Sequence, residues 1–318
     1  MIDVPVLFCI FNRPELTRQV FQRIRAARPK VLLIVSDGPR PDRAGEAALV
    51  EKSRSVIYDI DWSCEVKTNF ADENIGCKAR IATGITWAFE YTEELIILED
   101  DCLPDPTFFG YCGELLSRYR DDPKIMMISG NNFQPTSRTA ASYYFSHWTH
   151  IWGWATWKRA WQSFDIDVSD WPQRRGENFF KDIFPSAADQ QHWQQVMDNQ
   201  YAGLIDTWDF PWTYACWKSG GLTVLPDQNL VTNIGFGEAA THTTDDGSPL
   251  AGLPMHPMAE ITHAKQIARH ELADQYTLEN IMSVCSDKSA LRAETASPQP
   301  SRWRRLRQKI NKRLLQKD

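Results

Sequence analysis

Short apolar runs alternate with helical patterns along the first part of the chain. Residues 4–11 are rich in β-forming side chains, residues 13–27 repeat apolar positions at helical spacing, and residues 30–36 are again apolar. The same reading predicts helices at 43–57 and 78–91, with strands at 64–69, 95–98 and 125–129. Alternating strands and helices of this length favour an α/β fold with a central, mostly parallel sheet that is covered on both faces.

Polar side chains follow the predicted strands at the points where the strands end. Arg13 follows the first strand, Asp37 ends the second, and Glu99, Asp100 and Asp101 follow the run at 95–98. Ligands of open α/β sheets bind at these carboxyl ends. Adjacent carboxylates repel unless a cation compensates, and Mg²⁺ and Mn²⁺ prefer carboxylate and phosphate oxygens. The cluster therefore predicts a metal site that bridges the protein to a diphosphate; the alternative is an acidic, solvated turn.

Ten of the thirteen tryptophans lie between Trp148 and Trp217. Trp152 and Trp154 are candidates for packing against a sugar, whose ring is apolar on its faces and polar around its rim. Trp154, Trp157 and Trp161 also recur at helical spacing, which is the pattern of a helix in a protein core.

Charge is distributed unevenly along the 318 residues, whose formal net charge is −6. Residues 294–301 are rich in Pro, Ser and Thr and are expected to be a linker, whereas residues 301–318 hold eight Lys or Arg against one Asp. The apolar spacing in this tail predicts an amphipathic cationic helix, which would gain about 1 kcal/mol per basic residue at an anionic membrane. A solvated tail and contact with nucleic acid are the alternatives; membrane contact is favoured over both, and no nucleic-acid partner is expected.

Seven cysteines, an odd number without any Cys-x-x-Cys pair, fit a reducing cytosol and argue against a disulfide framework or a zinc site. The amino terminus has no cationic leader, and its apolar run is far shorter than a membrane span. We therefore expect a cytoplasmic protein, placed peripherally at the inner face of the membrane if the tail binds there.

Residues 98–109, Leu-Glu-Asp-Asp-Cys-Leu-Pro-Asp-Pro-Thr-Phe-Phe, resemble the acidic segment of GT-A glycosyltransferases. The similarity is to the N-acetylglucosaminyltransferase I type and to bacterial family 2-like enzymes of surface polysaccharide synthesis, and it extends in motif order over about residues 4–245. It implies a GT-A, Rossmann-like fold in one domain, 1–293, with a donor half to about residue 129 and an acceptor half beyond it. Residues 294–318 form the linker and tail.

The resemblance also implies an activity, which is inverting, metal-dependent transfer of a hexosyl group. The donor would be a nucleotide-diphosphate sugar, the acceptor a saccharide or a lipid-linked glycan, and the cofactor Mn²⁺ or Mg²⁺. Asp101 would be the direct metal ligand. Contacts with the substrate are implied for six other residues, which are Arg13, Asp37, Lys78, Arg80, Glu99 and Asp100.

The catalytic base is expected in Thr-Trp-Asp-Phe-Pro-Trp at 207–212, which is similar to a Trp-Asp segment of the family. The spacing to the second Trp differs by one residue, so Asp206 and Asp209 both remain candidates, and Asp209 is favoured because it follows the Trp directly. Its alternative role is to cap a helix. His242 lies in a loop of small residues and is a candidate for metal or phosphate contact, or is simply an exposed loop histidine.

Two other functions are compatible with such a fold. A sugar-phosphate nucleotidyltransferase would need a glycine-rich phosphate loop near the first strand, and residues 11–15, Phe-Asn-Arg-Pro-Glu, contain no glycine. A non-catalytic carbohydrate-binding relative is the third possibility. The carboxylates at positions 101 and 209 argue against it.

Overall fold

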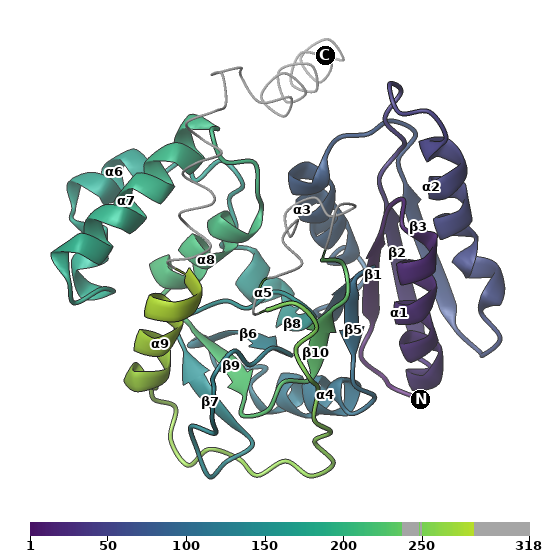
Figure 1. Cartoon of the computed structure of the whole chain (residues 1–318). Helices are drawn as coiled ribbons and strands as arrows, with labels where there is room; N and C mark the ends of the chain where they lie inside the picture. Colours follow the sequence, from purple (N-terminus) through teal and green to yellow (C-terminus); the bar gives the residue numbers. More distant parts are fainter. Residues whose placement is uncertain (237–247, 249, 283–318) are drawn as a thin grey trace.

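The computed structural model of the chain describes residues 1–236, 248 and 250–282 (Figure 1). Its strands are β1 (Val6–Ile10), β2 (Val31–Ser36), β3 (Glu65–Phe70), β4 (Glu94–Glu99), β5 (Cys102–Pro104), β6 (Ile125–Ser129), β7 (Tyr143–Ser146), β8 (Trp154–Trp157), β9 (Leu222–Pro226) and β10 (Val231–Asn233). Among the described residues, eight strands form one sheet in the order β3-β2-β1-β4-β8-β6-β9-β7, while β5 and β10 pair separately. Only β7 and β8 oppose the common direction, which confirms the expected α/β fold and mostly parallel sheet.

Helices cover both faces of this sheet. The helices of the described residues are α1 (Pro14–Ala27), α2 (Glu46–Arg54), α3 (Cys77–Ala88), α4 (Phe108–Arg118), α5 (Lys158–Trp161), α6 (Trp171–Gly176), α7 (Ala187–Ala202), α8 (Asp209–Lys218) and α9 (Glu271–Thr277). Single turns are η1 (Ser55–Asp59), η2 (Phe179–Asp182) and η3 (Leu278–Met282). In β1, the side chains of Val6, Phe8 and Ile10 join a core with α1 and α4, whereas Leu7 and Cys9 join a core with α3 and α8. The alternation follows from the period of two in a strand.

The tryptophan-rich stretch contributes to these cores in a way that the helical spacing did not predict. Trp154 and Trp157 begin and end strand β8, and only Lys158–Trp161 is helical. Three residues apart in a strand, their side chains lie on opposite faces, and they join the two different cores. The prediction of a core position is confirmed, but the prediction of a helix through Trp154 is wrong.

A third apolar core lies within the helical layer formed by α6, η2, α7 and α8 (Figure 1, teal). Trp148, Trp193 and Trp217 are almost completely buried there, with ring centroids 5.1–5.5 Å apart. Replacing one buried tryptophan with alanine typically costs about 3–5 kcal/mol. Much of the tryptophan content therefore stabilises this layer.

Among the described residues, no helix is both long enough and apolar enough to cross a membrane. The linker and tail at 294–318 lie outside the described residues.

Candidate active site

The strand order brings Arg13, Asp100 and Asp101 to the same edge of the sheet. From β1 the chain continues to β2 and then β3 on one side, whereas β4 pairs with β1 on the other side. This order, 3-2-1-4, creates a switch point at the carboxyl ends of β1 and β4, where doubly wound folds bind ligands. Arg13 lies just beyond β1, and Asp100 and Asp101 directly follow β4. The cationic side chain of Arg13 and the carboxylates of Asp100 and Asp101 therefore lie at the same end of the two strands.

Arg13 joins both aspartates. It immediately precedes Pro14, which starts α1 with the backbone geometry that a first helical position needs. One guanidinium nitrogen, Nη2, forms an ion pair with Asp100 Oδ1, and Nη1 lies 2.9 Å from Asp101 Oδ2. The main-chain N–H of Phe11 donates to Asp100 Oδ2 over 3.2 Å, so Asp100 is held from both sides. Burial opposes the charge on Arg13, but the two carboxylates outweigh it and raise the pKa of the guanidinium.

Two further carboxylates complete a carboxylate cluster of Glu99, Asp100, Asp101 and Asp209. Burial, followed by the charges of Asp101 and Asp100, raises the pKa of Glu99 to about 8, and the charge of Asp209 adds to this shift. Burial raises the pKa of the Cys77 thiol at the start of α3, and the charges of Glu99, Asp209 and Asp101 raise it further. Asp209 therefore lies close enough to the strand-end acids to influence their protonation, although it is more than a hundred residues away in sequence.

Helix α8 places Asp209 in the cluster. The helix begins at Asp209, and the preceding Trp208 is packed in the core. Asp209 Oδ1 accepts hydrogen bonds from the Thr207 hydroxyl and from the N–H of Phe210, the latter over 3.0 Å. The Asp209 carboxylate therefore also makes hydrogen bonds at the first turn of helix α8, so this residue combines a structural role with its place in the cluster. Asp206, the alternative base, is exposed.

The cluster favours an added cation because Asp100 and Asp101 share a single arginine and Asp209 adds negative charge nearby. No group of three or more His, Cys, Asp or Glu in the described part of the chain is arranged to hold a metal by itself. Mg²⁺ and Mn²⁺ sites often use only one or two carboxylates and complete their coordination with phosphate and water. Asp101 can take this part because its side chain stays 12% exposed, and a metal there would compete with Arg13 at Oδ2 and with the Cys102 thiol at Oδ1.

Gly235 packs directly against Asp101. Strand β10 pairs with β5 immediately after the acidic segment, and the N–H of Ile234 donates to the main-chain oxygen of Asp101 over 2.8 Å. A Cβ atom on Gly235 would lie 2.4 Å from Asp101 Oδ2 and 2.8 Å from Arg13 Nη1. Gly235 was not predicted from the sequence, because nothing local distinguishes it from the other glycines.

We expect Gly235→Ala to destabilise the protein by about 1–3 kcal/mol, the usual cost of forcing extra atoms into a packed site. Gly110→Ala is the matched control, because a Cβ atom there meets nothing within 4 Å and Gly110 lies in helix α4. Alanine should be neutral or stabilising by up to about 1 kcal/mol at that position. Urea unfolding measures both changes, and equal stabilities of the two variants would contradict the tight fit at Gly235.

Two residues expected to contact the substrate, Asp37 and Arg80, form hydrogen bonds within the protein instead. Asp37 Oδ1 accepts hydrogen bonds from the N–H groups of Gly38 and Ile75, and Oδ2 from Gly76, at 2.9–3.0 Å. Asp37 therefore holds the loop that enters α3. Arg80 is buried and donates to the main-chain and side-chain oxygens of Asn69.

Asp37 and Arg80 therefore both have structural roles, because their hydrogen bonds hold neighbouring segments of the protein in place. Burial raises the pKa of Asp37 despite its three N–H donors, and burial lowers the pKa of Arg80. Lys78, at the second position of α3, is half-buried and interacts with neighbouring groups.

The two tryptophans predicted to contact the sugar differ in burial. Trp154 is 1% exposed and stacks on Trp208, with ring centroids 5.8 Å apart, so it is a core residue and we leave it out of the sugar site. Trp152 is half-buried and contacts the ring of Phe236 edge to face at 5.7 Å. Phe236 directly follows Gly235, which places this aromatic pair beside the carboxylate cluster. Phe236 is a further site residue that the sequence did not reveal.

A buried histidine next to this pair predicts acid sensitivity. His150 is 3% exposed, its ring lies 4.4 Å from that of Phe133, and burial lowers its pKa to about 3. The unfolded chain takes up a proton below about pH 6.5, but the folded chain does not. The stability contributed by neutral His150 is therefore present above that pH and is lost as the pH falls towards 3.

Between roughly pH 7 and pH 5, the free energy of unfolding of the unmodified chain should fall by about 2 kcal/mol more than that of His150→Phe. Urea unfolding at the two pH values measures this difference. The exposed His256→Gln serves as the control and should behave as the unmodified chain does. Identical losses in all three proteins would show that His150 titrates in the folded state.

His242 lies outside the described residues, so its predicted metal or phosphate contact stays a prediction.

No protein-family model and no curated protein matches this chain. Among solved structures it is similar to a UDP-glucose pyrophosphorylase complexed with UDP-glucose, with 14% identity and a TM-score of 0.27 over 46% of this chain. The chain spans 62% of the length of that protein. It is also similar to the mannosyltransferase PcManGT from Pyrobaculum calidifontis in complex with GDP-Man and Mn²⁺, with 12% identity and a TM-score of 0.37 over 67% of this chain and 73% of that one. Both TM-scores are low, and we take nothing about function from either likeness.

Proposed function

We propose that this chain is a glycosyltransferase that moves a hexosyl group from a nucleotide-diphosphate sugar to a saccharide or lipid-linked glycan. The observation that carries the proposal is the meeting of Arg13 with the carboxylate cluster at the β1/β4 switch point. Such a crevice binds nucleotides in doubly wound folds, and the excess of carboxylates calls for a cation there. We assign donor handling to about 1–129 and acceptor handling to 130–293, within a GT-A type of fold.

The strand-end residues would handle the donor. Asp101 would hold Mn²⁺ or Mg²⁺ together with the diphosphate, and the bound metal would neutralise the charge that develops on the departing nucleotide. Asp100 fixes the orientation of Arg13 through its ion pair. Glu99, whose pKa is raised to about 8, is mostly protonated at neutral pH and adds no negative charge there. Trp152 and Phe236 would offer an apolar wall to the sugar ring.

Asp209 would act as the general base. It approaches the cluster from helix α8 rather than from the strand ends that carry the donor-binding residues. An acceptor hydroxyl bound next to it can lose its proton while it attacks the anomeric carbon from the side opposite the diphosphate. One carboxylate on each side of the sugar favours a single displacement with inversion.

The nucleotidyltransferase alternative is less compatible with the structure. The turn from β1 to α1 has Arg13 at the N-cap and Pro14 at the first helical position, and it presents an ion-paired side chain rather than a row of glycine N–H groups. No specific observation favours that reaction.

A binding screen tests the proposed function. UDP-, GDP-, dTDP- and CMP-linked sugars are titrated into the full chain by calorimetry, with and without Mn²⁺, alongside thermal-shift measurements. We expect one nucleotide class to bind in a Mn²⁺-dependent way and to raise the melting temperature. Absence of binding in every class would overturn the donor site.

Localisation is proposed from the sequence alone. The basic tail at 301–318 would bring the enzyme to the anionic inner face of the membrane, where a lipid-linked acceptor for surface polysaccharide is available. Co-sedimentation with phosphatidylserine vesicles, compared with phosphatidylcholine vesicles, tests this contact. Equal recovery with both would contradict it.

A further inference from the structure

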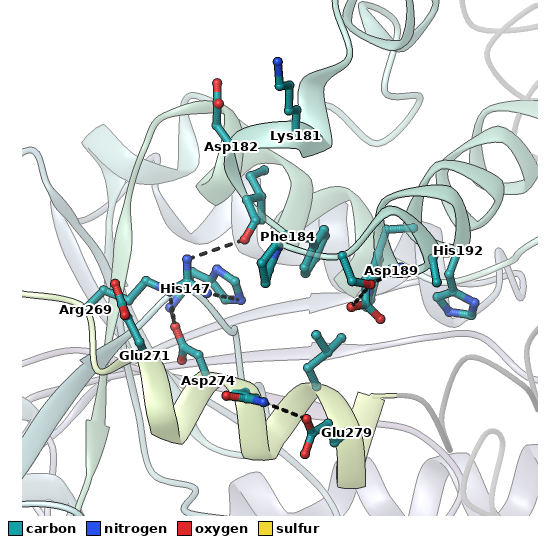
Figure 2. A pocket seen from close by; sticks show the side chains of 17 residues that line it. His147, Lys181, Asp182, Phe184, Asp189, His192, Arg269, Glu271, Asp274 and Glu279 are labelled. Carbon is teal, nitrogen blue, oxygen red and sulfur yellow. Dashed lines mark hydrogen bonds and ion pairs between the residues drawn. The ribbon is translucent and has the colours of Figure 1, made fainter.

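A cavity of about 730 Å³ lies apart from the carboxylate cluster (Figure 2). Its walls come from residues 181–193, which contain parts of η2 and α7, from residues 269–279, which contain α9 and part of η3, and from His147. Its size is within the range of small-molecule sites. None of the residues discussed above as substrate or metal contacts lines it.

One wall of the cavity is a fixed hydrogen-bonding surface. Arg269 Nε donates to Asp274 Oδ2 over 2.6 Å, Nη1 donates to the main-chain oxygen of Ile183 over 3.5 Å, and Nη2 lies 3.4 Å from His147 Nε2. Asp274 is buried and also accepts a hydrogen bond from the Ser146 hydroxyl. Because its partners hold the guanidinium in place, this wall is ordered before any ligand arrives.

Two buried nitrogen atoms of the lining residues have no partner. Trp193 is 2% exposed, and its indole N–H meets no acceptor among the described residues. The Nε2 atom of His192 is likewise buried without a partner in that part of the chain. A buried N–H that makes no hydrogen bond costs about 1–3 kcal/mol, so an acceptor oxygen that reaches the Trp193 indole N–H would be stabilised there.

The charges of the lining residues select against anions. The wall pair Arg269 and Asp274 is internally compensated, and Figure 2 shows Lys181 and Asp182 pointing away from the space enclosed by the other labelled side chains. The remaining charged residues are all acidic, and they are Asp189, Glu271 and Glu279. A nucleotide or phosphorylated ligand would be repelled. Sugar hydroxyls can donate to these carboxylates and can also accept from the indole N–H.

We propose that this cavity binds a neutral saccharide. Helix α8 connects the cavity to Asp209, because Trp217 near its end packs against both Trp193 and Phe184, with ring centroids 5.1 and 5.5 Å away. Eight residues of helix separate Asp209 from Trp217, which corresponds to about 12 Å. The bound saccharide is then the distal part of the acceptor glycan, a statement that rests on the proposed function, whereas saccharide binding itself does not.

Fluorine NMR on the full chain labelled with fluorotryptophan tests the proposal, with the Trp193 resonance assigned from a Trp193→Phe variant. The probes are maltotriose, cellotriose, mannotriose and triacetylchitotriose, with spermidine as a cationic probe and trigalacturonate as an anionic one. We expect at least one neutral trisaccharide to shift the Trp193 resonance. Asp189→Asn should weaken that binding about tenfold, whereas Asp182→Asn, whose side chain points away, should not change it.

Three outcomes would overturn the proposal. They are no shift with any neutral trisaccharide, a shift with spermidine alone, and equal weakening by the Asp182 and Asp189 variants. Thermal melts of each variant identify any loss of folding. Nucleotide-sugar binding is measured on the same samples, so loss of the donor site and loss of the saccharide cavity are distinguished from each other.

Discussion

Asp101→Asn should lower kcat/KM by about a thousandfold, because a metal that stabilises the leaving diphosphate contributes several kcal/mol to the transition state. The amide is the same size as the carboxylate, so the fold and the Arg13–Asp100 ion pair should remain. The amide carries no charge with which to hold Mn²⁺. We therefore expect the Mn²⁺-dependent part of nucleotide-sugar affinity to disappear, as measured by calorimetry with and without the metal.

Asp105→Asn is the matched control for this change. Asp105 lies four residues further along and accepts hydrogen bonds from the N–H and hydroxyl of Thr107, at the start of α4. Its variant should keep both activity and Mn²⁺ dependence. If Asp101→Asn retains full metal-dependent turnover, Asp101 is not the metal ligand and the cluster needs another explanation.

Asp209→Asn should lower kcat by about 10²–10⁴-fold while donor affinity stays within a small factor of that of the unmodified enzyme. A general base contributes this much to a proton transfer, and it contributes nothing to holding the nucleotide. Steady-state kinetics, combined with calorimetric titration of the donor, separate the loss of kcat from any change in donor affinity.

Asp206→Asn decides between the two candidate bases. Asp206 is exposed, whereas the charge of Asp209 contributes to the raised pKa of Glu99. The Asp206 variant should therefore retain nearly full activity. A large loss of kcat in that variant, with an active Asp209→Asn enzyme, would transfer the role to Asp206.

The sequence predicted the first half of the fold well because that half is built from local signals. Strands β1, β2 and β4 are apolar runs that end at polar residues, and α1 carries its apolar residues on one face. The same pattern correctly placed Arg13, Asp100 and Asp101 at one sheet edge, since parallel strands end together.

Other parts of the site depend on contacts between distant segments, and these have no local signature. Gly235 and Phe236 reach the cluster only because β10 pairs with β5, a short strand that the sequence did not predict. Asp37 was assigned to substrate from the family resemblance and Trp154 from its residue type, but main-chain donors occupy the first and a tryptophan cluster encloses the second. Residue type indicates which chemistry is possible, while the packing around the residue determines whether it is used.

The two outer strands of the sheet have a consequence for the behaviour of the protein at high concentration. An uncovered edge strand can pair with another molecule and start aggregation. On β3 the exposed Glu65 and the half-buried Lys67 form an ion pair, and these charges make the edge poorly suited to such pairing. On β7 a segment much later in the sequence covers the edge, since the N–H of His270 donates to the Phe145 carbonyl over 2.8 Å. The chain thus protects one edge by charge and the other by its own backbone, which should keep a sheet of this width from self-associating.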